Sequence, residues 1–155
     1  MKVSTKGRYA VMAMVELALL SQSEPVSLSQ IARKLNISQS YLEQLFVKMR
    51  RSCLVASTRG PGGGYVLAKP ANEIDMKTLL FSVGEGIVPV EGINKSEDVK
   101  CSGNEDMASL GSQFLWKELE VSIHDTLSRI TLADLCSSAE NSLRETDYPN
   151  FQIGI

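Results

Sequence analysis

The segment 27–67 constrains the fold most, because two short helical patterns in it are followed directly by a glycine-rich hairpin pattern. Ser27 and Gln30 form a capping-box pair that predicts the start of the first helix. Asn36 stands where a sharp turn needs a left-handed residue, a conformation that Asn tolerates. Ser38 is placed to cap the second helix. Two helices joined by a short turn and followed by a hairpin predict a winged helix-turn-helix.

The hairpin is predicted as strand 54–58, loop 59–64 and strand 65–67. Its loop suits a wing that enters a minor groove, because glycines let the backbone approach phosphates and an arginine is attracted to a narrow groove. An ordinary turn is the plainer interpretation. A phosphate-binding loop for a nucleotide is disfavoured, since no Lys-Ser/Thr pair follows and no helix begins there.

Helical patterns also flank this segment. An amphipathic helix is predicted over about 8–20, and Asp75 is placed to cap another helix. The longest pattern covers about 107–130, and Thr131 with Asp134 marks the start of a final helix. The expected fold class is mainly α with a small β-hairpin. The expected divisions are a winged helix-turn-helix domain at 1–83, a loop at 84–106, the long and final helices at 107–145, and a tail at 146–155.

The long helix carries an apolar stripe that a small lobe cannot cover. A helix over residues 107–130 would span about 36 Å, the diameter of a small domain. Part of the stripe should therefore need another surface. The stripe consists of Leu115, Leu119, Ile123, Leu127 and Ile130.

Charge is divided unevenly along the 155 residues. Residues 1–70 carry ten Lys or Arg against three acidic residues, whereas 71–155 carry six against fifteen. The formal net charge of −2 therefore combines a half of +7 with a half of −9. A basic half of this kind is typical of a part that binds a polyanion.

The second helix of the pattern offers side chains that can read bases in a major groove. Gln can pair with adenine, Ser can bond to most bases or to phosphate, and Glu can accept from cytosine. Ser38 has the plainer role of a helix cap, and the alternative for Glu43 is a solvated carboxylate. The candidate recognition residues are Ser38, Gln39, Ser40, Tyr41, Glu43 and Gln44. The candidate wing residues are Arg59, Gly60, Pro61, Gly62, Gly63 and Gly64, and the candidate phosphate contacts are Lys6, Arg8, Lys48, Arg50 and Arg51.

Other classes of protein are disfavoured. The apolar run 10–20 imitates a signal peptide, but Glu16 interrupts it and no stretch reaches the length of a membrane span. We therefore expect a cytoplasmic protein with no membrane partner. The three cysteines are few and far apart, which indicates a reducing compartment, and Cys53 and Cys136 are expected in the core. A single histidine and the lack of a catalytic constellation argue against an enzyme.

Three stretches resemble the IscR-like branch of the Rrf (Rrf-two) family of bacterial transcriptional regulators: Ser4-Thr-Lys-Gly-Arg-Tyr-Ala-Val11, Ser40-Tyr-Leu-Glu-Gln-Leu-Phe46 and Arg59-Gly-Pro-Gly-Gly-Gly-Tyr65. The likeness is close over about 1–83 and resumes in the two C-terminal helices. It implies a winged-helix domain and a long dimerisation helix that crosses its copy in a homodimer and buries the stripe. It also implies binding to roughly palindromic double-stranded promoter DNA, with the recognition residues reading bases and Arg59 entering the minor groove.

The resemblance further implies a [2Fe–2S] cluster held by three cysteines in the loop before the long helix and by a further ligand nearby. Cys101 is the only cysteine of 84–106. Counted back from Trp116, Gln113 holds the place of the family's histidine and Leu110 that of its last cysteine. A cluster needs about four protein ligands, usually thiolates, so no cofactor is expected. Cys101 stays a candidate metal ligand or reversible thiol sensor, with an inert thiol favoured.

The sequence therefore predicts a DNA-binding transcriptional regulator that acts as a homodimer on promoter sites, in iron–sulfur, redox or stress control. The alternative is a winged-helix protein-interaction module in which DNA binding is vestigial. Such a module does not need base-reading side chains together with a wing arginine, so the first interpretation is favoured. The operator, the signal, the choice between repressor and activator, and any contact with RNA polymerase stay open.

Overall fold

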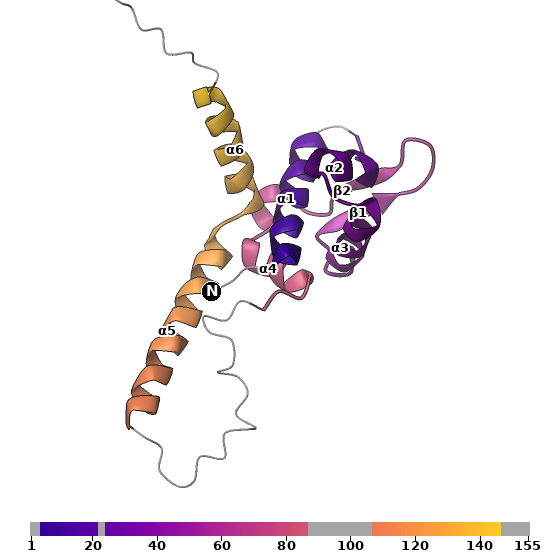
Figure 1. Ribbon diagram of the computed structural model, residues 1–155. Helices are drawn as coiled ribbons and strands as arrows, with labels where there is room; N and C mark the ends of the chain where they lie inside the picture. The colour runs from indigo at the N-terminus through magenta and orange to yellow at the C-terminus, as the bar shows by residue number, and fades with distance from the viewer. Residues whose placement is uncertain (1–3, 22–23, 87–106, 147–155) are drawn as a thin grey trace, which may run out of the picture.

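The computed structural model describes residues 4–21, 24–86 and 107–146. Cys101, most of the predicted loop and the predicted tail beyond residue 146 lie outside the described residues. The fold is mainly helical with one antiparallel hairpin, as predicted (Figure 1). The elements in chain order are α1 (Thr5–Leu20), α2 (Leu28–Leu35), α3 (Gln39–Arg51), β1 (Val55–Thr58), β2 (Gly64–Leu67), the 3₁₀ turn η1 (Ala71–Glu73), α4 (Met76–Ser82), α5 (Met107–Arg129) and α6 (Leu132–Thr146).

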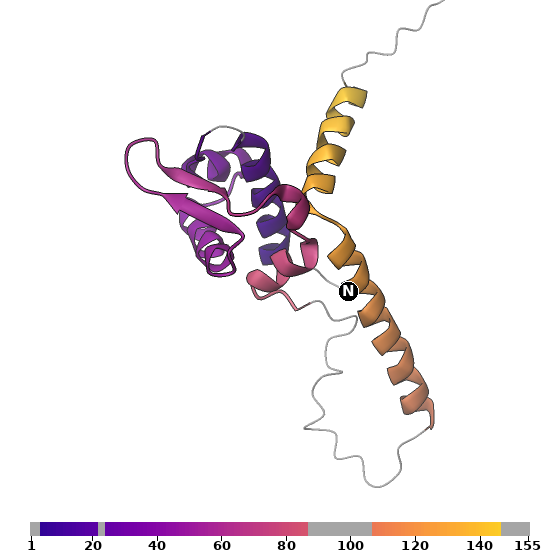
Figure 2. The ribbon, with the colours of Figure 1, turned by 180° about the vertical axis from the view of Figure 1, so that it is seen from behind.

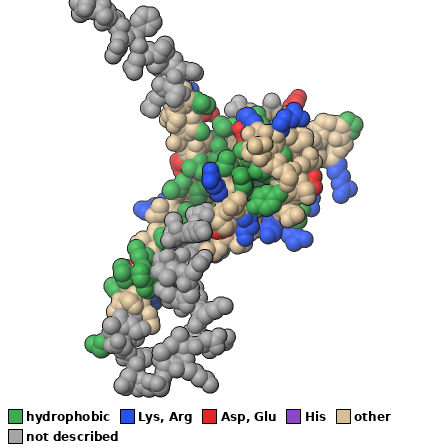
Figure 3. All heavy atoms as spheres, viewed as in Figure 1, with side chains coloured by type: hydrophobic (Ala, Val, Ile, Leu, Met, Phe, Trp, Pro, Cys, Tyr) green, Lys and Arg blue, Asp and Glu red, His purple; other side chains and the backbone are tan. Residues whose placement is uncertain are grey.

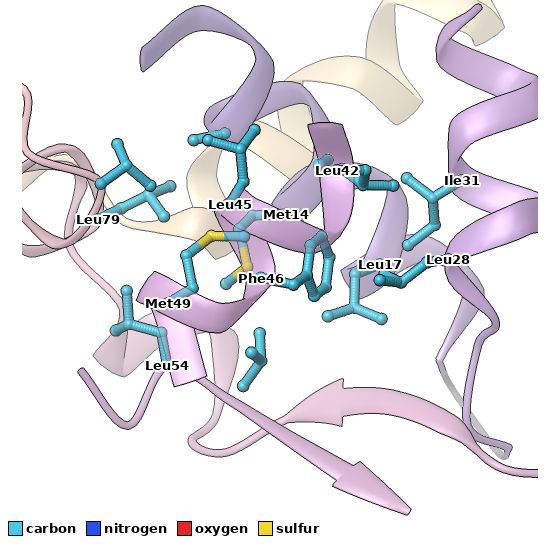
Figure 4. Packing of buried hydrophobic residues seen from close by; sticks show 14 of the residues in the cluster. Met14, Leu17, Leu28, Ile31, Leu42, Leu45, Phe46, Met49, Leu54 and Leu79 are labelled. Carbon is cyan, nitrogen blue, oxygen red and sulfur yellow. The ribbon is translucent and has the colours of Figure 1, made fainter. Parts of the chain in front are cut away.

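Helices α1 to α4 and the hairpin pack around one hydrophobic core. We call these elements together the winged-helix unit. Side chains from α1, α2 and α3 meet in its centre, where Phe46 of α3 lies among aliphatic neighbours (Figure 4). These positions recur three or four residues apart in each helix, which is the spacing of one buried helix face. The residues that lose all exposure include Ala10, Ala13, Met14, Leu17, Ile31, Leu42, Phe46, Met49 and Leu79.

The predicted caps set where the helices begin. The Ser27 hydroxyl accepts from the Gln30 backbone amide, and the Gln30 side-chain oxygen accepts from the Ser27 backbone amide, so the capping box is confirmed. Ser38 caps α3 through the Tyr41 amide, and Asp75 caps α4. Helix α1 begins earlier than predicted, at Thr5, because Ser4 supplies its cap.

Helices α2, α3 and α4 all end in the same motif, a left-handed residue flanked by two nested backbone hydrogen bonds. The left-handed residues are Asn36, Cys53 and Gly84, with φ of 52°, 55° and 77°. After α3, the Leu54 amide donates to the Met49 carbonyl at 3.0 Å. The expectation that Cys53 is a core residue was wrong: it ends the helix in this position, and its side chain is exposed. Cys136 is half-buried and packs against the core.

Strand β1 pairs with β2 with Val55 opposite Leu67. The base of the hairpin is also tied to the segment before α2, because Val26 and Tyr65 exchange two backbone hydrogen bonds of 2.9 and 2.8 Å. Gly64 is required at this contact, since a Cβ there would lie 2.5 Å from the Val26 carbonyl oxygen. The wing is therefore anchored at its base, and only its loop projects (Figure 2).

Helices α5 and α6 extend along one side of the winged-helix unit, away from the wing (Figures 1 and 2). Their junction is fixed to the unit by two backbone hydrogen bonds, from Met76 to Ile130 at 2.9 Å and from Leu132 to Ile74 at 2.8 Å. The Asp134 carboxylate accepts from the amide and hydroxyl of Thr131, so the predicted cap of α6 is confirmed. Among the described helices, none is both long and apolar enough to cross a membrane.

The left-handed conformation of Cys53 predicts a stabilising substitution. Cys53→Gly should raise the free energy of unfolding by about 0.5–1 kcal/mol. Glycine adopts positive φ without the steric penalty that cysteine suffers there, and this gain should exceed the entropic cost of glycine. Urea unfolding at pH 7 measures the change. The matched control is Ser52→Gly, where φ is −89° and glycine brings only its entropic cost. A Cys53→Gly protein no more stable than Ser52→Gly would contradict the assignment of strain.

Candidate nucleic-acid interface

The first turns of α3 present a polar face to solvent. Gln39, Ser40, Glu43 and Gln44 are exposed, whereas the opposite face of the helix is buried in the core. The Gln39 side-chain amide donates to the Glu43 carboxylate at 2.9 Å, which fixes the orientation of these two groups relative to each other. Ser38 is engaged as the cap, so the plainer interpretation of that residue is confirmed without excluding a second contact.

The basic residues at the end of α3 lie beside the wing. Lys48, Arg50 and Arg51 are all exposed in the last turn. Arg50 also donates to the Ser57 hydroxyl of β1 at 3.4 Å, which links the helix to the hairpin. Cations at this end of the helix also suit its negative dipole.

The loop of the wing places Arg59 at its start, exposed to solvent. Gly60 and Gly62 have φ of 105° and 75°, and the Gly63 amide donates to the Gly60 carbonyl at 2.9 Å. Pro61 is exposed between them. This tight loop can approach a nucleic-acid backbone closely, because Gly60, Gly62 and Gly63 carry no side chain to hold it away, while Gly64 packs at the base of the loop.

The two basic residues at the start of α1, Lys6 and Arg8, have different surroundings. Arg8 is exposed. The Lys6 ammonium donates to the Gly84 carbonyl at 2.9 Å, at the C-terminal end of α4. Three residues after Lys6, the ring of Tyr9 contacts that of Tyr41 on α3 edge to face, with centroids 6.1 Å apart. The first two turns of α1 therefore touch both the end of α4 and α3, the helix that carries the candidate recognition residues.

Glu85 is a residue that the sequence reasoning did not identify. It is the one buried charged side chain among the described residues, with 7% of its surface exposed. Its carboxylate accepts from the Ser4 amide at 2.9 Å and also from the Ser4 hydroxyl. Burial raises the pKa of Glu85, but the hydrogen bonds from Ser4 and the charge of Lys6 lower it more, so its pKa lies below the ordinary value. The buried carboxyl is therefore ionised at neutral pH.

Basic and apolar surfaces occupy different parts of the molecule. In Figure 3 most of the visible Lys and Arg side chains lie on the winged-helix unit, several along the edge near α3 and on the wing, while the far part of α5 shows hydrophobic side chains. Of the predicted stripe, Leu127 and Ile130 pack against the protein's own core. Exposed apolar side chains of α5 are Met107, Phe114, Leu115, Leu119 and Val121, with 83%, 69%, 51%, 39% and 48% of their surface exposed.

Candidate metal ligands do not converge in the described part of the chain. No three His, Cys, Asp or Glu side chains are placed there to hold a metal ion. His124 of α5 contacts the ring of Phe81 edge to face at 5.5 Å, which is a packing role. Gln113 is exposed on α5. Cys101 lies outside the described residues.

Comparisons with known proteins agree with this geometry. A family model described as Rrf2, iron-dependent transcriptional regulator, matches residues 3–138. The chain is 42% identical over 143 residues to the HTH-type transcriptional regulator IscR of Pectobacterium carotovorum, covering 90% of this chain and 82% of that protein. It is 43% identical over 143 residues to IscR of Vibrio parahaemolyticus, covering 90% and 80% of the two chains.

Two solved structures have the same fold along nearly their whole length. T. potens IscR superposes with a TM-score of 0.73 and 35% identity, over 97% of this chain and 93% of that one. CymR, the global cysteine regulator of B. subtilis, superposes with a TM-score of 0.72 and 35% identity, over 89% and 98%. The likeness therefore includes the helices that follow the winged-helix unit.

Proposed function

The chain belongs to the Rrf2 family of transcriptional regulators, and from this premise we propose that two copies bind one promoter site together, with α3 in the major groove and the wing in the adjacent minor groove. Like its relatives, the protein is a sequence-specific DNA-binding regulator and not an enzyme. The observation that carries the docking proposal is the exposed polar face of α3, together with the exposed cations of its last turn and Arg59 of the wing.

Base reading is assigned to the polar face of α3. Gln39 and Glu43 act as one hydrogen-bonded unit, so a base that contacts either group meets a fixed pattern of donors and acceptors. The Glu43 carboxylate repels phosphate, so it tolerates DNA only where a base donor meets it. Ser40, Tyr41 and Gln44 complete the proposed reading surface.

Phosphate contacts are assigned to the exposed cations Arg8, Lys48, Arg50 and Arg51, and minor-groove entry to Arg59. Lys6 was predicted among these contacts. Because its ammonium bonds to the Gly84 carbonyl, we propose that Lys6 holds α1 against the end of α4 instead of contacting a phosphate. Its charge still adds to the long-range attraction between the protein and DNA.

Homodimerisation is proposed through α5. Its C-terminal part packs on the winged-helix unit, but five apolar side chains of the remainder are exposed. Exposed apolar surface of this extent on a projecting helix marks an interaction surface. A second copy of α5 presents the same surface, so a two-fold pair buries both, and Leu115 and Leu119 lie at its centre.

The residues of this chain do not fit the iron–sulfur cluster that the resemblance implies. The place of the family's histidine on α5 holds Gln113, and an amide is a poor ligand for iron in such clusters. The cysteines of the described part are separated between the end of α3 and helix α6. We therefore propose regulation without a resident cluster, in the cytoplasm where the promoter lies. Cys101 stays a candidate metal ligand or reversible thiol sensor, with an inert thiol favoured.

Two substitutions separate base reading from phosphate attraction. Arg59→Ala should weaken binding to a selected 30-base-pair site and to unrelated DNA alike, and lower the slope of log affinity against log salt by about 1. Glu43→Ala should instead broaden the set of sequences selected from a random library. Fluorescence anisotropy measures the affinity and its salt slope, and sequencing of the selected library measures the sequence preference. Arg144→Ala on α6 is the control. Equal effects of both substitutions on all sequences would contradict the assigned roles, and a flat salt plot would contradict DNA binding itself.

A double substitution tests the dimer. Leu115→Glu with Leu119→Glu should raise the dimer dissociation constant by more than about a hundredfold, because the proposed interface would bury two charges on each copy. Sedimentation equilibrium measures it, and circular dichroism checks the fold. The control is Gln113→Glu, which adds a single like charge to the opposite side of the same helix. A dimer unchanged by the double substitution would exclude this face.

Metal content tests the cofactor proposal. The protein purified without oxygen should contain far less than one iron and one sulfide per chain, since it lacks the thiolates that hold a cluster. Iron and acid-labile sulfide assays with a visible absorption spectrum measure this. Iron and sulfide in equal amounts, at about one cluster per chain, would overturn the proposal.

A further inference from the structure

Glu85 links the end of α4 to the beginning of α1. Its own backbone is held by the left-handed end of α4, where the Glu85 amide donates to the Leu80 carbonyl at 3.0 Å. Its carboxylate accepts two hydrogen bonds from Ser4, and the Ser4 hydroxyl in turn accepts from the Gly7 amide at 3.4 Å. Beside it, Lys6 bonds to the Gly84 carbonyl. Two adjacent points on the α4 end therefore hold the first turn of α1.

The contact is closely packed as well as hydrogen-bonded. A Cβ added to Gly7 would lie 3.2 Å from the Glu85 carboxyl carbon and 3.2 Å from a methyl of Leu80. The first turn of α1 thus lies directly on the carboxylate, with no room for a side chain between them. The two hydrogen bonds from Ser4 offset the cost of burying this charge, so the carboxylate itself holds the two segments together.

The residue after the first turn of α1 touches α3, the proposed recognition helix. Tyr9 follows Gly7 by two residues and packs edge to face on Tyr41 of α3, and Arg8 lies exposed between them in sequence. Building on the proposed function, we propose that Glu85 is a positioning residue for DNA binding: through Ser4 and Gly7 it sets the first turns of α1, and thereby the placement of Arg8 and of Tyr41 on the DNA-reading face.

The substitution that tests this is Glu85→Gln, because electrostatics and positioning predict opposite signs. Removing one negative charge from a DNA-binding protein should by itself strengthen its attraction to DNA. Glutamine has the same shape, but an NH2 donor replaces one of the two acceptor oxygens, so the Ser4 amide and hydroxyl can no longer each donate to an oxygen of their own. Positioning therefore predicts that affinity for the selected 30-base-pair duplex falls, by roughly threefold to tenfold.

The matched control is Glu16→Gln on the same helix. Glu16 also anchors α1 through a charged contact, an ion pair with Lys34 of α2, but it lies farther along the helix and away from the first turn. Glu16→Gln should leave affinity unchanged or slightly raised. Anisotropy at fixed salt, at a temperature where circular dichroism shows every variant folded, compares the three proteins.

A double-mutant cycle with Ser4→Ala identifies the route. If Glu85 acts through Ser4, the double variant should lose no more affinity than either single variant. Additive losses, unchanged affinity of Glu85→Gln, or an equal loss in Glu16→Gln would overturn the proposal. Failure of the parent protein to bind any duplex with salt dependence would instead count against the proposed function.

Discussion

The burial of α1 is the constraint on which the rest of the structure depends. Ala10, Ala13, Met14 and Leu17 lose all solvent exposure. The helix packs against α2, α3, α4, α6 and β2, so it is the common neighbour of α3, the hairpin and the C-terminal helix α6. Two alanines on the buried face allow neighbouring helices to approach closely. Because interiors are close-packed, the position of α1 fixes the positions of α3 and the hairpin, the elements proposed to face DNA.

The sequence predicted what local chemistry determines. Ser27, Ser38 and Asp75 cap helices because a side-chain oxygen near the free amides of a first turn satisfies them in almost any tertiary setting. Cys53 could not be placed in the same way. The left-handed end of a helix favours glycine, and only the observed backbone shows that a cysteine occupies it. Apolar neighbours in sequence indicated a core position, whereas the side chain of Cys53 is exposed.

The hydrogen bonds between Ser4 and Glu85 could not be predicted from the sequence for a different reason. Their partners are 81 residues apart in the sequence, and no motif contains both residues. Pattern reasoning finds contacts that recur at a fixed spacing, such as the polar face of α3, and misses a contact created by where two helices happen to end. The same holds for α5: its stripe was identified, but the point where the stripe leaves the core, between Leu119 and Leu127, follows from the size of the winged-helix unit.

The uneven charge of the chain gains a structural meaning from these contacts. Several cations of the basic half are tied within the protein, Lys6 to the Gly84 carbonyl and Lys34 to Glu16. Their charges still act over a screening length of about 8 Å and so help to attract DNA. Direct neutralisation of phosphate, however, needs an ammonium or guanidinium that can reach the backbone. The number of counterions released on binding should therefore follow the exposed cations near α3 and the wing, and be smaller than the net charge of the basic half.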